Sequence, residues 1–138
     1  MSGLFKKAHD DLDEKIKVAD IEIKNKMILK NSKKYEKYIY FSNDYLIVPC
    51  RSAYELFEES RVLNHCVRQY IDRVAENKTE IFFIRRKAEP NLPNTTLELK
   101  DRRVIQCYCE NDNIPDDDIK AFVKSWASKN KFKLNCWR

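Results

Sequence analysis

The sequence predicts an α+β fold, in which a small, mainly antiparallel sheet packs with helices, and three observations support this class. Apolar residues recur every four positions between Leu4 and Ile16, as they do along one face of a helix. Residues 95–109 contain two strand-like runs around a short polar turn, which is typical of an antiparallel hairpin. A second helical pattern follows Pro115. Helices and strands that occur in separate runs are typical of an α+β domain.

Length and composition indicate one compact unit. With 138 residues, of which 43% are hydrophobic, the chain is long enough for one domain with its own core. We therefore predict a single domain over residues 1–138, with an amino-terminal helix at about 4–28 and a core at about 36–129. Gly3 is the only glycine, so left-handed backbone positions must fall to asparagine and aspartate. The asparagines that lie near expected turns or element ends are Asn64, Asn77, Asn94, Asn111 and Asn113.

The first third of the chain predicts a helix followed by a hairpin. The helical pattern that starts at Leu4 becomes mixed between residues 21 and 28, where the helix is expected to bend or end. Residues 31–34 are polar and predict a break. Strand-forming residues lie on both sides of a Ser-Asn-Asp turn at 42–44, so residues 38–48 predict a hairpin, which Pro49 closes.

The next segment begins with a strong helix start signal. Ser52 is a favourable N-cap, and Glu55 three residues later completes a capping box. The helix is expected to begin at Ala53 and to run past Glu59, with Leu56 facing inward.

A second helical stretch and a central strand follow. Residues 67–76 predict a helix, and Asn77 is suited to end it in the left-handed conformation. Residues 79–87 predict a strand whose apolar centre places it inside the sheet, and residues 89–94, with two prolines, predict a loop. The apolar face of the helix consists of Val67, Tyr70, Ile71 and Val74.

Residues 95–100 and 103–109 form the clearest hairpin of the sequence, but its register stays open. A two-residue loop would place Leu97 opposite Gln106, whereas a three-residue loop would place Glu98 there. Because a shift of one residue moves every side chain to the other face of the sheet, the two registers predict different sites.

The carboxyl-terminal segment predicts one more helix at residues 116–129. Acidic residues at its start suit the positive end of the helix dipole. Its apolar stripe consists of Ile119, Phe122, Val123 and Trp126.

Charge gives a modest indication of the partner. Lys and Arg number 27 against 22 Asp and Glu, a formal net charge of +5, which favours anionic partners such as nucleic acid. Five basic residues are expected to form a patch at one end of the sheet, where Tyr108 or Phe83 offers a ring for stacking. The alternative is an ordinary solvated edge protected by charge. The five residues are Arg85, Arg86, Lys87, Arg102 and Arg103.

Several protein classes lack sequence support. No run of about 18 apolar residues exists, so we expect no membrane partner. The charged amino terminus lacks the apolar core of a signal peptide, and five cysteines are an odd number, so we expect reduced thiols and a cytoplasmic protein. Cys107 and Cys109, with His65 or Cys66, give only a weak zinc pattern, and we predict no metal and no cofactor. Phosphate-binding Walker loops and the common hydrolase motifs are absent.

Short motifs over about residues 5–128 occur in the order of a known family. They are His9-Asp10, Pro49 before Ser52-x-x-Glu55-Leu56, Leu63-x-His65-Cys66-Val67-x-x-Tyr70, the strand Ile81–Arg86, Thr96-Leu97-Glu98, Gln106 and Trp126. This order resembles the PcfJ-like family, whose members occur on conjugative plasmids, phages and prophages. The resemblance implies a mobile genetic element as the setting of this chain.

The chain departs from the family pattern at three glycines. The glycine after His-Cys-Val is Arg68 here, the glycine near the end of that helix is Asn77, and the glycine after the glutamine strand is absent from the region before Asn113. If these glycines admit the phosphate or backbone of a ligand, this chain is expected to have lost that ability. Arg68 beside His65 would then block or recharge a pocket, and it is also a candidate for binding nucleic acid or a partner.

The resemblance places His65 in a fixed motif with Tyr70 and Glu98, and these residues with Gln106 are the candidate catalytic set. Such a set can position a nucleotide or a water molecule. It can equally form a buried polar network that fixes a helix against the sheet, which is the interpretation that we favour. Cys66 is expected to be a buried structural thiol rather than a nucleophile.

Three functions are compatible with these observations. The leading hypothesis is a non-catalytic accessory protein of a phage or plasmid that binds nucleic acid or a nucleoprotein complex. The second is an enzyme that acts on a nucleotide or nucleic acid through the His/Tyr/Glu/Gln set. The third is an inhibitor of a host defence system, like an anti-CRISPR protein, on a PcfJ-like scaffold. A deep pocket that holds the four residues would favour the second hypothesis over a filled core.

Overall fold

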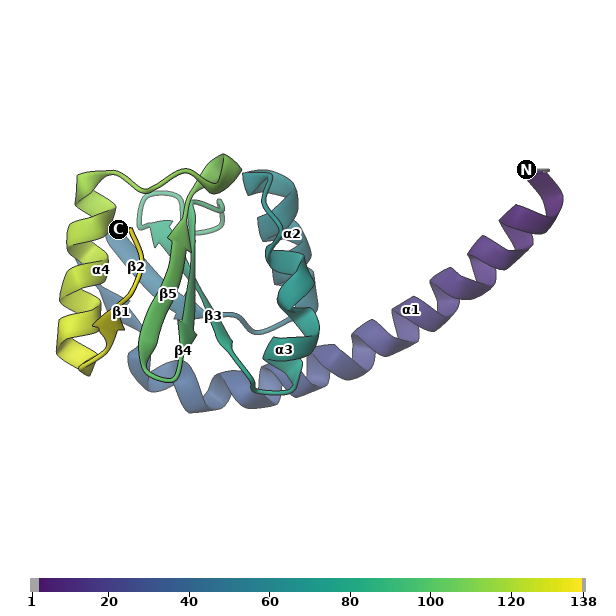
Figure 1. The fold of residues 1–138 in the computed structure, drawn as a ribbon, viewed down its shortest axis with the longest axis horizontal. Helices are drawn as coiled ribbons and strands as arrows, with labels where there is room; N and C mark the ends of the chain where they lie inside the picture. Colours follow the sequence, from purple (N-terminus) through teal and green to yellow (C-terminus); the bar gives the residue numbers. More distant parts are fainter. Residues whose placement is uncertain (1–2, 138) are drawn as a thin grey trace.

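The fold is a six-stranded sheet with helices on both faces (Figure 1). The structure, a computed structural model, describes the backbone of residues 3–137 and the side chains of residues 18–137. Helix α4 covers one face of the sheet, and α2 and α3 cover the other. The carboxyl-terminal half of α1 crosses below the sheet and packs against α3. The predicted α+β class with a mainly antiparallel sheet is confirmed.

The strands follow one another in the sheet in their order along the chain. Neighbours are antiparallel, except that β6 runs parallel to β5. The predicted central position of the strand at 79–87 is confirmed, since β3 lies between β2 and β4. The strands are β1 (Tyr40–Phe41), β2 (Tyr45–Pro49), β3 (Glu80–Arg86), β4 (Thr95–Lys100), β5 (Arg103–Tyr108) and β6 (Lys133–Leu134).

Four α-helices and three short 3₁₀ helices connect these strands in the described part of the chain. The α-helices are α1 (Gly3–Ser32), α2 (Ala53–Leu63), α3 (Ile71–Ala75) and α4 (Asp117–Asn130). The 3₁₀ helices are η1 (Lys33–Tyr38), η2 (Val67–Tyr70) and η3 (Glu110–Asp112). None of the described helices combines the length and the apolar composition that a membrane crossing requires.

The predicted bend or end of the helix between residues 21 and 28 is wrong, because α1 continues to Ser32, where the predicted polar break at 31–34 coincides with the change to η1. Tertiary contacts explain the extension. The Asn31 side-chain amide donates to the carbonyl oxygens of Val74 (3.1 Å) and Ala75 (2.9 Å) at the end of α3. Ile28 is fully buried one turn earlier. Asn31 therefore docks the last turn of α1 onto α3.

Alternation along the strands creates one core on each face of the sheet. Phe82 and Leu97 point toward α4 and pack around Trp126, whose Nε1 donates to the carbonyl oxygen of Tyr38 at 2.7 Å. Ile81 and Phe83 point the other way, toward α2 and α3. The predicted stripe of α4 is confirmed, because its four residues are all buried.

The two predicted helix caps differ in detail from expectation. Ser52 caps α2 as predicted, since its hydroxyl accepts from the Glu55 backbone N–H at 3.1 Å. In a capping box the Glu55 carboxylate would accept from the backbone N–H of Ser52. This half of the prediction is wrong, because the carboxylate accepts from the Arg51 N–H at 2.7 Å. Asn77 has a φ of 58°, as predicted for its left-handed role, and Asn64 ends α2 with a φ of 49°. Left-handed residues other than Asn and Asp are Arg102, Lys131 and Trp137.

The hairpin of β4 and β5 combines features of both open registers. Its turn has two residues, Asp101 and Arg102, with φ values of 51° and 63°, and Lys100 pairs with Arg103. Beyond the turn, however, Glu98 rather than Leu97 lies opposite Gln106. A β-bulge next to Leu99 inserts one extra residue in β5 and shifts the register. The bulge places Glu98 and Gln106 on the same face of the sheet.

Candidate functional site

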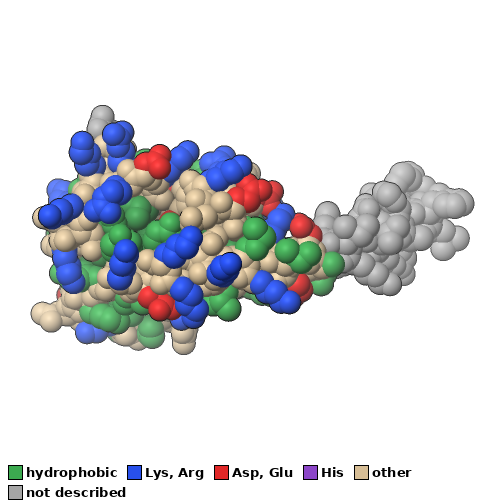
Figure 2. Space-filling view, turned by 90° about the horizontal axis from the view of Figure 1, so that it is seen from below, with side chains coloured by type: hydrophobic (Ala, Val, Ile, Leu, Met, Phe, Trp, Pro, Cys, Tyr) green, Lys and Arg blue, Asp and Glu red, His purple; other side chains and the backbone are tan. Residues whose placement is uncertain are grey.

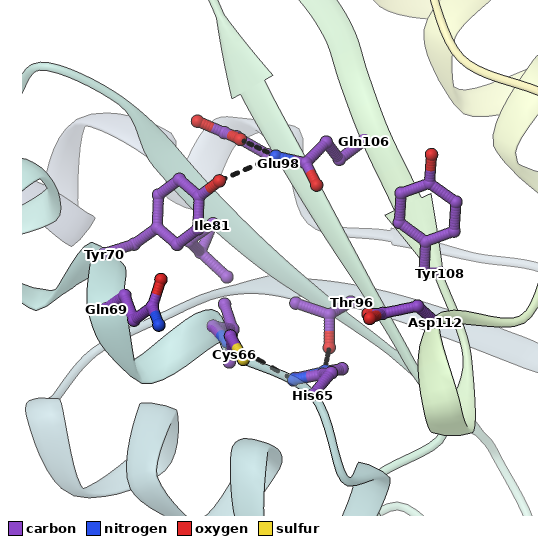
Figure 3. Close-up of a pocket in the computed structure, with 11 residues that line it drawn as sticks. His65, Cys66, Gln69, Tyr70, Ile81, Thr96, Glu98, Gln106, Tyr108 and Asp112 are labelled. Atoms are coloured by element: carbon purple, nitrogen blue, oxygen red, sulfur yellow. Dashed lines mark hydrogen bonds between the residues drawn. The ribbon is translucent and has the colours of Figure 1, made fainter.

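A cleft of about 420 Å³ opens between η2 and the face of β4 and β5. The structure brings the four predicted site residues together here: His65, Tyr70, Glu98 and Gln106 all line the cleft (Figure 3). The other lining residues are Cys66, Val67, Gln69, Ile81, Thr96, Tyr108 and Asp112. The set therefore lines a hollow of the surface.

Local structure explains this convergence. The left-handed turn at Asn64 ends α2, so His65 and Cys66 leave the helix and form the rim of the cleft. The short η2 then presents Tyr70 toward the sheet. On the opposite side, the bulge in β5 places Gln106 beside Glu98.

A closed hydrogen-bond network forms the floor of the cleft. Gln106 Nε2 donates to Glu98 Oε1 and to the Tyr70 hydroxyl, both at 2.8 Å. Thr79 Oγ1 donates to Glu98 Oε2 at 2.6 Å. Glu98 is only 3% exposed, and each of its carboxylate oxygens accepts one of these bonds.

This network fixes which groups face the cleft. A carboxylate oxygen only accepts, so the NH₂ group of Gln106 must point at Glu98 and Tyr70. The carbonyl oxygen of Gln106 consequently turns into the cleft, where no described residue donates to it (Figure 3). The Tyr70 hydroxyl accepts from Gln106 and keeps its own proton to donate. The floor thus presents a hydrogen-bond donor next to an acceptor.

His65 belongs to a second chain of hydrogen bonds. The Thr96 hydroxyl donates its single proton to Glu59 Oε2 at 2.7 Å, so His65 Nε2, at 2.9 Å from this hydroxyl, must donate to it. His65 Nδ1 accepts from the Val67 N–H at 3.4 Å. Both contacts require the neutral tautomer with the proton on Nε2. Burial lowers the pKa of His65, which also favours the neutral ring.

A buried ion pair anchors this chain behind the cleft. Arg85 Nη1 donates to Glu59 Oε2 at 3.1 Å, and Arg85 Nη2 contacts Glu59 Oε1. Glu59 is fully buried. Its burial raises its pKa above the ordinary value, and the Arg85 guanidinium opposes this shift. With Thr96, the pair holds His65 in a fixed orientation.

The structure does not bring the five predicted basic-patch residues together. Arg85 is buried against Glu59 and takes no part in a surface patch. Arg86 and Lys87 lie at the end of β3, whereas Arg102 and Arg103 lie beside its start. Because β3 and β4 are antiparallel, these groups occupy opposite ends of the sheet. Adjacent residues also alternate between the two faces of a strand, and this alternation separates Arg85 from Arg86.

Two other expectations about residues at the cleft are wrong. Arg68 is exposed but does not line the cleft, so it neither blocks nor recharges it. Cys66 is exposed rather than buried, because Asn64 ends the helix before it. Cys107 lies in the core on the α4 face, away from His65, and the described residues contain no cluster of three possible metal ligands.

Glu59, Thr96 and Thr79 complete the two networks and were not among the predicted site residues. One signal for Glu59 was available. It follows the inward-facing Leu56 by three residues, so helical spacing places a carboxylate on a buried face. Such a residue needs a buried cationic partner, which Arg85 provides.

Comparison with known proteins now identifies the family. The model of the PcfJ-like protein family matches residues 4–123. The chain belongs to the PcfJ-like family. It is also 31% identical over 110 residues to an uncharacterized protein, Lin1253/Lin1744, of Listeria innocua serovar 6a. That match covers 78% of this chain but 24% of the Listeria protein, so the chain spans about a quarter of its relative. No solved structure matches.

The PcfJ-like motifs can now be placed in the fold. The His-Cys motif and the Thr-Leu-Glu strand supply opposite walls of one cleft. Asn77 adopts the left-handed conformation with a φ of 58°. Asn111 and Asp112 do the same after β5, with φ values of 56° and 58°. Asparagine and aspartate adopt this conformation more readily than other residues that carry a Cβ atom. The side chains of His9 and Asp10 lie outside the described residues.

Proposed function

We propose that this PcfJ-like chain is a non-catalytic accessory protein of a mobile genetic element that binds nucleic acid by receiving an unpaired base in its cleft. The observation that carries this proposal is the pair of free groups at the floor, the Tyr70 hydroxyl and the Gln106 carbonyl oxygen. Their partners in the network hold both in place, so the cleft presents a fixed donor and acceptor at little ordering cost.

The chemistry of a nucleobase fits this pair. Every base carries an acceptor atom next to an N–H group on its Watson–Crick edge, and proteins read this edge in single strands. The cleft volume of about 420 Å³ falls in the usual range for sites that hold small organic groups. Tyr108 and Ile81 on the lining offer an aromatic ring and an apolar surface to the face of a base.

The hydrogen bonding favours binding over catalysis. A general base needs a free acceptor within reach of the substrate proton. Both nitrogens of His65 are engaged, one with Thr96 and one with Val67. Both oxygens of Glu98 are engaged as well, and this side chain is almost fully buried. The cleft therefore supports the binding hypothesis better than the enzyme hypothesis, although it gathers the residues that the latter requires.

Removing the Tyr70 hydroxyl should weaken binding to bases and leave binding to phosphates unchanged. For the Tyr70→Phe variant we expect a 2- to 10-fold higher Kd for a single-stranded oligonucleotide, about the factor of one hydrogen bond. Fluorescence anisotropy measures this Kd. An oligonucleotide of equal length with abasic residues should bind the variant and the wild type equally.

Tyr54→Phe is the matched control, since Tyr54 is exposed on α2 and does not line the cleft. It should leave both Kd values unchanged. Equal binding of base-bearing and abasic oligonucleotides by the wild type would contradict the proposal. Turnover of the oligonucleotide that depends on His65 would instead favour the enzyme hypothesis.

A further inference from the structure

A second hollow, of about 260 Å³, lies at the end of the sheet where the β4–β5 turn is found. Four segments meet there: η1, the residues before β3, the turn, and the segment after α4. The residues that define its character are Tyr35, Tyr38, Lys78, Lys100, Arg102 and Phe132. Aromatic and cationic side chains thus surround one hollow, outside the cleft described above, together with one exposed acidic residue, Asp101.

Aromatic contacts hold these segments together. The rings of Tyr38 and Phe132 pack edge to face with centroids 5.0 Å apart. The Tyr35 hydroxyl donates to Asn77 Oδ1 at 3.1 Å. With its two tyrosines turned inward, η1 leaves Lys34 and Lys37 exposed to solvent. The arrangement is therefore a fixed surface that carries cations.

Positive charge dominates this end of the molecule, and Figure 2 shows many Lys and Arg side chains and few acidic ones on the face seen from below. We name as the basic end face the side chains of Lys33, Lys34, Lys37, Lys78, Lys100, Arg102, Lys131 and Lys133, all of which are exposed.

Few of these charges are neutralised. Within the described residues, ion pairs join Lys33 to Glu36 and Lys78 to Glu76, and both pairs are exposed and therefore weak. The other cations of the basic end face make no ion pair with a described residue. Glu80 lines the hollow, and burial raises its pKa to about 8, so it adds no negative charge at neutral pH.

We infer that the basic end face binds the phosphate backbone of a nucleic acid strand whose base enters the cleft. The inference rests on the proposed function for the identity of the partner. Exposed cations interleaved with aromatic rings are the usual composition of surfaces that follow a single strand. An anionic membrane is the other partner that such a surface fits, but aromatic rings that enter a membrane project outward, whereas the rings here are turned inward around a hollow.

The geometry connects the two sites. Lys100 lies on the same strand and face as Thr96 and Glu98, which line the cleft, four residues from Thr96 and two from Glu98. At about 3.3 Å per residue the separation from Thr96 is on the order of 13 Å. A few nucleotides of a single strand span that length, so one strand can occupy both sites.

Salt dependence tests this inference. In the triple variant Lys34→Gln, Lys37→Gln and Lys100→Gln, each lost phosphate contact should lower the slope of log K against log salt by about 0.7, and the whole slope by about 2. At 0.1 M salt the Kd should rise about 10- to 100-fold. The Kd values for base-bearing and abasic oligonucleotides should rise by the same factor, whereas in the Tyr70→Phe variant only the Kd for the base-bearing oligonucleotide rises.

The matched control removes three exposed charges outside the basic end face, two at the other end of the sheet and one in the middle of α4, in the triple variant Arg86→Gln, Lys87→Gln and Lys124→Gln. It should keep the wild-type slope. An equal loss in both triple variants, with both folded by circular dichroism, would overturn the inference in favour of unspecific attraction. Unchanged nucleic-acid binding with lost binding to phosphatidylserine vesicles would overturn it in favour of a membrane. Because abasic strands report on this face alone, its failure is separable from failure of the cleft.

Discussion

Replacing Arg85 with methionine is expected to lower the free energy of unfolding by about 3–5 kcal/mol, the largest effect of any single substitution considered. The change leaves the fully buried Glu59 carboxylate without its cationic partner, and an uncompensated buried charge costs this much. Urea unfolding followed by tryptophan fluorescence measures the difference.

The double variant Glu59→Leu with Arg85→Met distinguishes the loss of the whole ion pair from the loss of one partner. Because the desolvation cost of both charges disappears together, its stability should lie within about 1–2 kcal/mol of the wild type. A double variant as unstable as the single one would show that hydrogen bonds to Thr96, and not charge compensation, dominate this network.

Replacing Glu80 with glutamine is expected to stabilise the protein at neutral pH. Neither carboxyl oxygen of Glu80 has a hydrogen-bond partner of good geometry among the described residues. Burial raises the pKa of Glu80 from 4.5 to about 8. Between these two values the folded state keeps the proton that the unfolded state releases, so stability falls as pH rises. At pH 7 the cost approaches about 3 kcal/mol, and glutamine removes it.

The sign of this effect is checked by unfolding both proteins at several pH values. Near pH 4 the two should be about equally stable, since Glu80 is then protonated in both states. The advantage of Glu80→Gln should grow up to about pH 8 and then stay constant. Glu89→Gln, at an exposed position, should show no such trend. A stability difference that does not vary with pH would mean that Glu80 is not protonated in the folded protein.

Local sequence signals were sufficient for several elements of this fold. The stripe of α4, the N-cap at Ser52 and the apolar strand β3 each depend on neighbours in the chain, and each is confirmed. The continuation of α1 beyond residue 28 was not predictable in this way. Its last turn is stabilised by Asn31, whose partners lie more than 40 residues away.

The residues of the site were predictable from the sequence, but their hydrogen-bond partners were not. The family resemblance singled out His65, Tyr70, Glu98 and Gln106 together, and the structure places them around one cleft. The register of β4 and β5, which places Glu98 opposite Gln106, depends on a β-bulge that no residue pattern predicts. Arg85 on β3 pairs with Glu59 on α2, 26 residues earlier in the chain. No local pattern indicates so distant a partner, and Arg85 was therefore predicted to lie on the surface.

The central claim is that a base, and not only a phosphate, enters the cleft between η2 and β5. The most direct measurement is a nuclear magnetic resonance titration of ¹⁵N-labelled protein with a single-stranded tetranucleotide and with its abasic equivalent. We predict that the side-chain amide signals of Gln106 shift only when the base-bearing tetranucleotide is added. The backbone amide signals of Lys100 and Arg102 should shift with either oligonucleotide. Shifts at Lys100 and Arg102 with no change at Gln106 would contradict the account.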